Sequence, residues 1–509
     1  MSERAVIVGA GVAGLTAAFA LAARGVDVTV LEREAVPGGK IRRVEVGGHE
    51  IDSGPTVFTM RWVFDELFAQ AGKVFVDHVR LRPLDILARH AWDETARLDL
   101  FADEERSIAA IGHFAGAAEA ERYRVFCHDT RRIYQILEKP FLRSDRPSLA
   151  ALLGANGFSG LLELPRIKPF SAMAAALAQY FHDPRLRQLF GRYATYCGSS
   201  PSLAPATLML VAHVERDGVW SVEGGMYRLA TALAEAAKGS GATFRYGAEV
   251  REVLTVNGRA RGVVLASGER VEANAVIVNA DIAALTGGLF GASARRAAPG
   301  IPARARSLSA ITWSMLARTS GFPLVRHNVF FSQDYAAEFE AIFRHDTLPY
   351  EPSVYVCAQD RGDDGTATQD DERLLVLINA PADGDRHDYQ TSEVERCTQR
   401  TFGVLERRGL KLSRQRMQVT TPTDFNARFP ATGGALYGRS SHGWTASFQR
   451  PGARTKIPGL YLASGSAHPG PGVPMAALSG RAAAACLLAD LTSRAPSRTM
   501  ATRGGTSTR

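Results

Sequence analysis

Residues 5–32 have the sequence AVIVGAGVAGLTAAFALAARGVDVTVLE, and this stretch decides the fold. Residues 5–8 are apolar and mostly β-branched, which predicts a buried parallel strand. GAGVAG follows over residues 9–14, and the Ala-rich stretch after it predicts a helix that Gly25 ends. A second predicted strand over residues 27–31 leads into Glu32. Strand, G-x-G-x-x-G, helix, strand and acid together predict a Rossmann unit that binds a dinucleotide.

The three glycines of this motif each have a physical role. Gly9 allows the tight turn, Gly11 lets the backbone approach a pyrophosphate, and Gly14 lets the helix pack closely on the strand. The N-terminus of the helix then faces the phosphates. Glu32 stands close to the spacing expected for the acid that accepts hydrogen bonds from the ribose hydroxyls.

Length, charge and cysteine content limit the number of domains, the possible partners and the cellular compartment. A chain of 509 residues allows two or three domains. The net charge of +8 is small for this length; it permits contact with an anionic membrane surface and does not indicate nucleic-acid binding. The five cysteines form no C-x-x-C pair, so we expect neither a zinc ribbon nor a disulfide scaffold, and reduced thiols suit a cytosolic protein.

Residues 5–23 carry no charge and could be mistaken for a signal anchor. The glycines of the motif interrupt this stretch, and no A-x-A cleavage site is followed by a mature start. The sequence therefore predicts a protein that is not integral to the membrane.

The segment after Glu32 distinguishes NAD from FAD. PGGK over residues 37–40 and IDSGPTV over residues 51–57 follow the acid. This order resembles the FAD-binding, amine-oxidase-like flavoproteins, and the resemblance implies that Lys40 adds a cation to the pyrophosphate. The alternative is an ordinary turn with a solvated lysine. Candidate cofactor residues from these two motifs are Gly38, Gly39, Lys40, Gly54, Pro55 and Thr56.

The middle of the chain is less informative. Residues 76–217 show helical patterning, for example over 171–181 and 186–196, and strands are predicted over 312–317, 354–357 and 374–379. The acidic loop over residues 360–373 is interpreted as solvated and not as a metal site. No catalytic constellation stands out, and we interpret the following polar residues as surface or packing groups: His90, Arg131, Arg132, Arg143, Arg166, Lys168 and Arg192.

A predicted meander follows the helix that opens at residue 223. Its strands span 250–256, 260–265 and 275–279, and Asn257-Gly258 predicts a two-residue hairpin turn. By resemblance to the flavoproteins, the backbone of Val250 touches the adenine half of FAD. Asp281 either ends the last strand at the cofactor side or caps a helix.

The C-terminal motif predicts a strand over 459–463, the loop SGSAHPGPGVP over 464–474 and a helix over 475–491, with Pro474 as its first residue. The free N–H groups and the positive dipole end of such a helix suit a reduced flavin. We take Gly465, Pro474 and Met475 as cofactor-binding candidates; a purely structural turn is the alternative. His468 could touch the flavin or a substrate, or only cap the turn, and no chemistry is assigned to it.

Over residues 5–490 the chain resembles the carotenoid desaturase family of the phytoene desaturase type. The stretches that carry the resemblance are the N-terminal motif, DSGPTVFTM, VEGGMYRL, HNVFFSQDY, TPTDFNARFPATGGALYG and LYLASGSAHPGPGVPMAALSG. Within the family, GPTVFTMRWVFDELFAQ, LRPLDILARHAW and LFGRYATYCGSSP most resemble the 1-hydroxycarotenoid 3,4-desaturases of purple photosynthetic bacteria. Related amine oxidases carry an acid in the last strand–loop, where this chain has Ser464-Gly465-Ser466, so an amine oxidase is not favoured.

The resemblance implies an α/β fold. A Rossmann-like FAD-binding domain of the glutathione reductase and amine oxidase type is expected over 1–75, 218–290 and 450–491. A discontinuous, mixed α+β substrate and membrane-docking domain is expected over 76–217 and 291–449, with a disordered basic tail over 492–509.

The resemblance also implies a reaction. The expected enzyme introduces a C3–C4 double bond into 1-hydroxy- or 1-methoxy-neurosporene-type acyclic carotenoids by hydride transfer to flavin N5 and proton loss. An apolar tunnel would hold the chain, and an acceptor such as oxygen or a quinone would take the electrons. An exposed apolar patch, aided by Arg residues, would attach the enzyme peripherally to the cytoplasmic face of the inner membrane. The alternatives are a phytoene- or neurosporene-type desaturase, a flavin-dependent carotene isomerase or saturase, and a non-redox prenyl-binding carrier.

Overall fold

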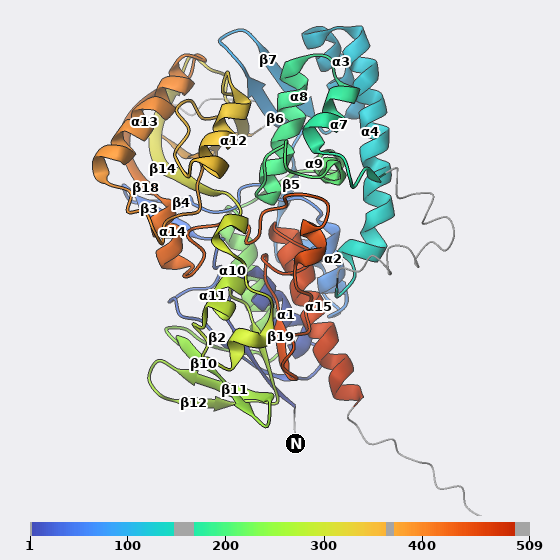
Figure 1. Cartoon of the computed structure of the whole chain (residues 1–509), viewed down its shortest axis with the longest axis vertical. Helices are drawn as coiled ribbons and strands as arrows, with labels where there is room; N and C mark the ends of the chain where they lie inside the picture. Colours follow the sequence, from blue (N-terminus) through green and yellow to red (C-terminus); the bar gives the residue numbers. More distant parts are fainter. Residues whose placement is uncertain (1–2, 147–166, 363–370, 494–509) are drawn as a thin grey trace, which may run out of the picture.

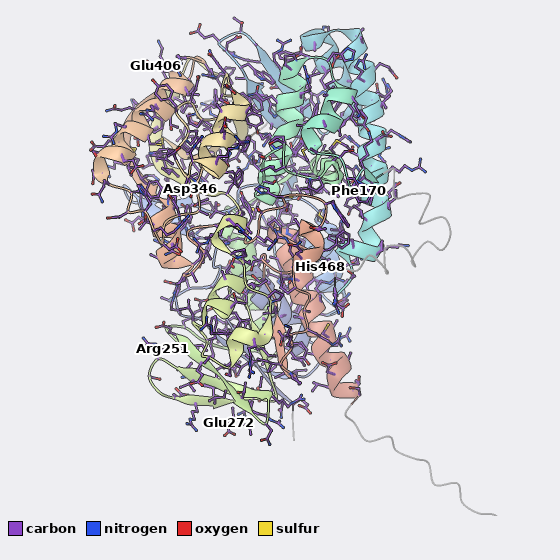
Figure 2. The ribbon with its side chains drawn as sticks, viewed as in Figure 1. Phe170, Arg251, Glu272, Asp346, Glu406 and His468 are labelled. Atoms are coloured by element: carbon purple, nitrogen blue, oxygen red, sulfur yellow. The ribbon has the colours of Figure 1, made fainter. Side chains whose placement is uncertain are left out.

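The computed structural model describes residues 3–146, 167–362 and 371–493 (Figure 1). The molecule is elongated, and its two largest sheets lie one above the other along the long axis. Figure 2 labels Arg251 and Glu272 on the small sheet at one end, and Glu406 on a helix at the opposite end. Arg166 and most of the predicted tail, from residue 494 on, lie outside the described residues.

The first sheet is the predicted Rossmann sheet. It has five parallel strands in the order β19-β13-β1-β2-β9. Ile7 pairs with Val30 on one side and with Ile277 on the other, so strands far apart in the chain meet at the motif. The bounds are β1 (Arg4–Val8), β2 (Asp27–Leu31), β9 (Thr243–Arg245), β13 (Ala275–Val278) and β19 (Leu460–Leu462).

Three helices pack in one hydrophobic core with this sheet: α1 (Val12–Ala22), α10 (Tyr227–Gly239) and α15 (Val473–Thr492). Among the helices of the described residues, α15 is the one that is long and apolar enough to cross a membrane. It lies along α1 instead, and a Cβ added at Gly480 would overlap the carbonyl oxygen of Ala13. This is the packing of a core helix.

The first two predicted meander strands are β10 (Val250–Val256) and β11 (Arg259–Leu265), which form a separate antiparallel sheet with β12 (Arg270–Glu272). The third predicted strand, over 275–279, was wrongly placed in the meander, because it is β13 and pairs in parallel with β1 and β19. Asn257 and Gly258 have φ values of 51° and 74°, as a type I′ turn requires. The predicted two-residue hairpin is therefore confirmed.

The second large sheet has seven strands in the order β18-β14-β17-β16-β15-β6-β7. The predicted strands at 312–317, 354–357 and 374–379 are the centres of β14 (Ser309–Ser320), β16 (Val354–Ala358) and β17 (Glu372–Ala380). The others are β6 (Ile86–Ala91), β7 (Arg97–Phe101), β15 (His327–Phe330) and β18 (Lys411–Thr420). Helix α13 (Thr391–Glu406) packs on one face, and α12 (Tyr335–Arg344) follows β15.

Helical patterning was the wrong prediction for residues 81–101. β6 joins the sheet through a parallel pairing with β15, more than two hundred residues later in the chain, and β7 pairs antiparallel beside it. Local pattern cannot register such a distant partner. A further short strand, β5 (Leu81–Pro83), pairs with β8 (Trp220–Val222).

The other described residues of this block are mostly helical, as predicted. The helix predicted over 186–196 is α8 as far as Gly191 and continues as a tighter 3₁₀ turn over Arg192–Cys197. The remaining helices are α2 (Trp62–Ala69), α3 (Glu104–Ala115), α4 (Ala117–Leu137), α7 (Met173–Tyr180), α8 (Pro184–Gly191), α9 (Leu210–Arg216), α11 (Ile282–Gly287) and α14 (Pro422–Arg428).

The strands of the two large sheets alternate along the chain. Those of the parallel sheet fall within 1–75, 218–290 and 450–491, and those of the seven-stranded sheet within 76–217 and 291–449. The hairpin β3 (Arg43–Val46) and β4 (His49–Asp52) belongs by sequence to the first set but packs its apolar side chains on Leu316 of β14.

The contact between α1 and α15 predicts that a Gly→Ala substitution within a helix destabilises the protein, the reverse of the usual effect. Gly to Ala inside a helix normally stabilises by up to about 1 kcal/mol. Gly480→Ala should instead lower the free energy of unfolding by about 1–3 kcal/mol, because its Cβ would overlap Ala13 and lie 3.0 Å from Thr16 Cβ. Chemical denaturation measures the change. Gly403→Ala in α13, where only the end of the Arg407 side chain is close, is the matched control and should be neutral or stabilising. Equal effects of the two substitutions would contradict the tight contact.

Candidate functional site

A single cavity of about 1540 Å³ runs from the glycine motif into the helical block. Residues of β1, β2 and the C-terminal loop line one end, and residues of β14, β16, β17 and the helical block line the other. The candidates from sequence that line it are Gly9, Gly11, Glu32, Gly38, Gly39, Lys40, Gly54, Pro55, Thr56, Val250, Asp281, Gly465, Pro474 and Met475. Gly14 does not line the cavity; it lies behind the cavity wall, where it lets α1 approach the backbone of Gly9 closely.

Asn279, at the end of β13, explains the spacing of the three motif glycines. A Cβ at Gly9 would lie 2.6 Å from the Asn279 carbonyl oxygen, and a Cβ at Gly11 or Gly14 would lie 2.8 or 2.7 Å from its Oδ1. Asn279 Nδ2 also donates to the carbonyl oxygen of Ala463, 2.6 Å away. The glycines thus let one amide side chain join the loop, β13 and the end of β19.

The N-terminus of α1 is free to meet an anion. Its N-cap residue Gly11 makes no side-chain cap, and no acidic residue stands in the first turn. Both features leave unsatisfied N–H groups at the positive end of the helix dipole. The cavity begins at this point, as a pyrophosphate requires.

Glu32 is held at the end of β2 by the backbone. Its Oε2 accepts from Ala10 N at 2.6 Å and its Oε1 accepts from Glu34 N at 2.9 Å. The side chain borders the cavity, so its remaining lone pairs are available to ribose hydroxyls.

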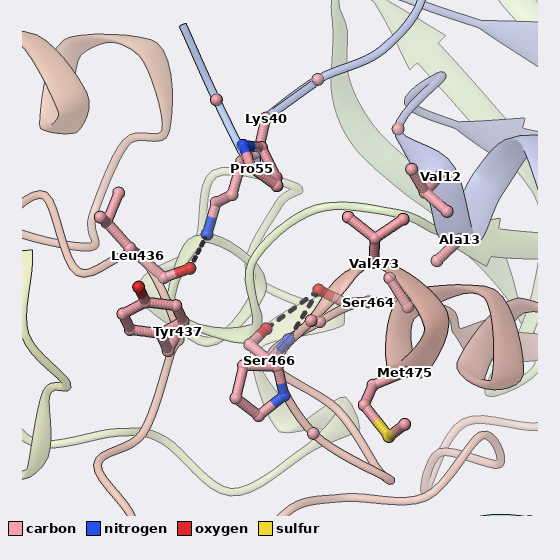
Figure 3. A pocket seen from close by; sticks show the side chains of 18 of the residues that line it. Val12, Ala13, Lys40, Pro55, Leu436, Tyr437, Ser464, Ser466, Val473 and Met475 are labelled. Atoms are coloured by element: carbon pink, nitrogen blue, oxygen red, sulfur yellow. Dashed lines mark hydrogen bonds between the residues drawn. The ribbon is translucent and has the colours of Figure 1, made fainter. Parts of the chain in front are cut away.

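Lys40 borders the cavity and donates from Nζ to the carbonyl oxygen of Leu436 at 2.5 Å (Figure 3). Burial lowers the pKa of the amine, and the carboxylate of Asp281 opposes that shift. A fully solvated lysine is therefore excluded. Asp281 fulfils both of its predicted roles, because it faces the cavity and caps α11 by accepting from Ala283 N at 2.9 Å.

The C-terminal loop forms the other wall of this end. Ser464 and Ser466 bond to each other at 3.0 Å, which fixes the turn, and a Cβ at Gly465 would meet nothing within 4 Å (Figure 3). Helix α15 begins at Val473, so Pro474 is its second residue and not its first. Its N-cap Gly472 makes no side-chain cap, and its first turn has no acid. A second helix N-terminus therefore meets the same cavity.

His468 does not reach the cavity. It is buried, and its Nε2 donates to the carbonyl oxygen of Phe141 at 2.8 Å, with Ser144 Oγ at 3.1 Å. Burial lowers the pKa of the imidazole to about 4, so the ring is neutral. Of the roles considered from sequence, the structural one fits: the side chain ties the C-terminal loop to residues 138–144.

Gly54 borders the cavity and also has a packing role. A Cβ there would overlap the carbonyl oxygen of Lys40, so the glycine serves the approach of two backbone segments. Thr56 faces the cavity, and its Oγ1 lies 2.7 Å from the hydroxyl of Tyr355.

Of the polar residues in the middle block, Arg192 is buried. It lies in the cavity wall, donates to the Tyr196 hydroxyl at 2.5 Å and stands 3.9 Å from Glu215. Both tyrosine hydroxyls of the 3₁₀ turn donate to Glu215. Tyr196 and Glu215 were missed because nothing in their local sequence relates them to Arg192.

The other polar candidates take part in packing or ion pairs away from the cavity. Arg131 pairs with Glu104, Arg143 with Glu66 and Glu138, and Lys168 donates to Tyr180. His90 is buried in β6. In the described part of the chain no group of His, Cys, Asp or Glu could hold a metal ion, and residues 363–370 of the acidic loop lie outside that part.

The site fits FAD at both ends of the cofactor. Two uncapped helix N-termini suit the pyrophosphate and the electron-rich edge of a reduced flavin, and Glu32 suits the ribose. The empty space at Gly465 admits a flat ring against the backbone. Val250, with Ala248 and Arg251, borders the cavity near Glu32.

Comparisons with known proteins agree with this geometry. The model of the flavin containing amine oxidoreductase family matches residues 12–488. Hydroxyneurosporene desaturase of Rubrivivax gelatinosus is 54% identical over 100% of this chain and 97% of that protein. The protein of the same name from Cereibacter sphaeroides is 43% identical over 96% and 98%. The 4,4'-diaponeurosporene oxygenase of Staphylococcus aureus is 28% identical over 94% and 97%.

Solved structures show the same fold. An oxidoreductase from Methanosarcina mazei has a TM-score of 0.61 at 18% identity, covering 94% of this chain and 99% of that chain. Putrescine oxidase has a TM-score of 0.58 at 17% identity, covering 96% and 99%. The predicted α/β flavoprotein fold is thus confirmed, and FAD is the cofactor that the site and the family share. The chain belongs to the flavin containing amine oxidoreductase family.

Proposed function

We propose that this enzyme is an FAD-dependent carotenoid desaturase that introduces the C3–C4 double bond into 1-hydroxy- or 1-methoxy-neurosporene-type acyclic carotenoids in a photosynthetic bacterium. The 54% identity to a hydroxyneurosporene desaturase along the whole chain supports the substrate class. Bound FAD supplies a two-electron acceptor beside the bond that is oxidised.

The observation that carries the proposal is the continuity of one cavity from the cofactor end into an apolar part of the protein. The wall beyond the cofactor end is mostly hydrocarbon, and this part of the site excludes water from a long polyene. It includes Leu137, Leu142, Ile167, Leu208, Leu210, Val211 and Val214.

The chain's own residues bind and orient the substrate. A polyene delocalises the charge that develops on oxidation of an allylic carbon, so the protein needs shape more than a strong acid or base. In the ionisable pair in this wall, Glu215 accepts hydrogen bonds from Tyr193 and Tyr196, and Arg192 donates from Nη1 to Tyr196, whereas its Nε and Nη2 are buried without a hydrogen-bond partner. An acceptor such as oxygen or a quinone then takes the electrons.

We extend the proposal to the membrane, where such a substrate dissolves. Phe170 is 75% exposed and Trp444 is 41% exposed, their rings stand 5.2 Å apart, and both border the cavity (Figure 2). Leu203, exposed beside them, accepts from Gly443 N. An apolar rim at a substrate cavity suits peripheral docking on the cytoplasmic face of the inner membrane.

Substrate feeding tests the central claim. Membranes that contain the protein should convert 1-hydroxyneurosporene to a product with a red-shifted spectrum after chromatography, because the new double bond extends the conjugated system. Neurosporene, which lacks the terminal oxygen, should be a poor substrate. Conversion of neurosporene or phytoene in preference would move the enzyme to the general carotene desaturases.

Gly465→Val tests the place of the flavin. A Cβ at this position meets no neighbouring heavy atom within 4 Å, so the chain should fold, but the valine side chain fills the space that the flavin needs. Bound flavin, measured by visible absorbance of the purified protein, should fall by roughly tenfold or more. The far-ultraviolet circular dichroism spectrum should not change. Gly403→Ala, away from the cavity, should keep its flavin; a yellow Gly465→Val protein would place the ring elsewhere.

Phe170→Asp tests the apolar rim. Burial of one phenylalanine contributes about 1.5–3 kcal/mol, so binding to lipid vesicles should weaken at least severalfold in a co-sedimentation assay. Val256→Asp is the matched control, because Val256 is equally an exposed apolar residue but lies on the small sheet away from the cavity. Equal loss in both variants would show that any added charge is enough, and no loss in either would remove the rim from the proposal.

A further inference from the structure

One face of the seven-stranded sheet is part of the cavity wall. Thr312 of β14 pairs with Leu377 of β17, Leu377 pairs with Tyr355 of β16, and Tyr355 pairs with Val329 of β15. All four residues border the cavity. The row is a hydrocarbon surface interrupted by two hydroxyl groups, and these differ in their surroundings.

The hydroxyl of Tyr355 is the centre of a short hydrogen-bonded chain. It lies 2.7 Å from Thr56 Oγ1 and 2.7 Å from Nδ1 of His327. Thr56 and Tyr355 border the cavity, whereas His327 lies behind them and is 2% exposed. Thr312 Oγ1, by contrast, has no hydrogen-bond partner.

The direction of donation along these hydrogen bonds follows from His327, the buried end of the series. Burial lowers the pKa of His327 to about 3, so the imidazole is neutral and carries one N–H. Its Nε2 is buried and has no partner. A buried N–H without an acceptor is rarer than a bare lone pair, which places the proton on Nδ1. Nδ1–H then donates to Tyr355, and Tyr355 donates to Thr56. The hydrogen of the Thr56 hydroxyl is left for the cavity.

We propose that the Thr56 hydroxyl, oriented by Tyr355 and His327, donates a hydrogen bond to the terminal oxygen of the carotenoid. Thr56 is then a specificity-determining residue, and Tyr355 and His327 are positioning residues. This inference rests on the proposed function. A donor suits a hydroxyl and a methoxy group alike, because both oxygens accept.

The position of Thr56 gives this contact a second role. Thr56 follows directly on Gly54 and Pro55, which border the cofactor end of the cavity. The oxygen is carried by C1, and the oxidised bond begins only two carbons further along the chain. A group that holds the oxygen therefore also sets which bond stands beside the flavin. The long remainder of the polyene extends toward the rim at Phe170 and Trp444.

The test is the ratio of two rates. Holoenzyme with Thr56→Val, which keeps the shape and loses the hydroxyl, is given neurosporene and 1-hydroxyneurosporene in competition. The preference for the hydroxylated substrate should fall roughly threefold to tenfold, the size expected of one hydrogen bond between neutral groups. Thr56→Ser should restore it. Tyr355→Phe should also lower it, because Thr56 loses the partner that fixes its rotamer, while Tyr350→Phe, an exposed tyrosine outside the cavity wall, should not.

The outcomes separate the inference from the proposed function. A wild type that prefers 1-hydroxyneurosporene, with the same preference in Thr56→Val and Tyr355→Phe, overturns the inference and leaves the function standing. Equal loss of rate with both substrates in these variants also overturns it, since that is the effect of structural damage. A wild type without preference for the hydroxylated substrate overturns the proposed function itself. Flavin content is measured in every variant, so a loss of cofactor is not mistaken for a change in specificity.

Discussion

Asn279 makes the contacts on which the cofactor end depends. Its backbone carbonyl lies against Gly9, its side chain lies against Gly11 and Gly14, and its amide donates to Ala463, so the first loop of the chain, the end of β13 and the end of β19 meet around one residue. Any side chain on the glycines would push these segments apart. Since the walls of the cofactor end grow from these same three segments, their separation would open the cavity. The G-x-G-x-x-G pattern is therefore a requirement of the protein's own packing as well as of the cofactor.

The single cavity has two chemical halves with different demands. The cofactor half is built from backbone: free N–H groups at two helix ends, a carboxylate held by amides and a glycine with open space beside it. The other half is built from side chains on the seven-stranded sheet and the helical block, and it is mostly apolar; its polar groups include the Thr312 hydroxyl, the chain through Tyr355 and the group around Arg192. Backbone groups recognise what all flavoproteins share, and side chains recognise what differs between substrates.

Sequence alone predicted the parts whose function is local. The glycine motif, the Asn-Gly turn, the C-terminal loop and the central strands of both large sheets were located, because each depends on neighbours in the chain. The strands β3 to β9, β12, β15 and β18 were not predicted. Prediction failed where a partner is remote. β6 pairs with β15, Arg192 forms an ion pair with Glu215, and Thr56 is linked by hydrogen bonds to Tyr355 and through it to His327. His468 was left ambiguous for the same reason, since its partner Phe141 belongs to another block. The close approach of Gly54 to the carbonyl oxygen of Lys40 was likewise not predicted.

The order in which the chain is synthesised has a consequence for the cofactor. The nucleotide wall forms from β1 and α1, which leave the ribosome first, whereas the flavin wall needs β19 and the start of α15, which leave it last. Between them the chain must also assemble a sheet from strands as distant as β6 and β18. The cofactor end is therefore incomplete until the last residues of the sheet and the start of α15 have joined the first loop. Flavin insertion becomes the closing event of biogenesis, and loss of the last helix would release a chain that is nearly complete but colourless.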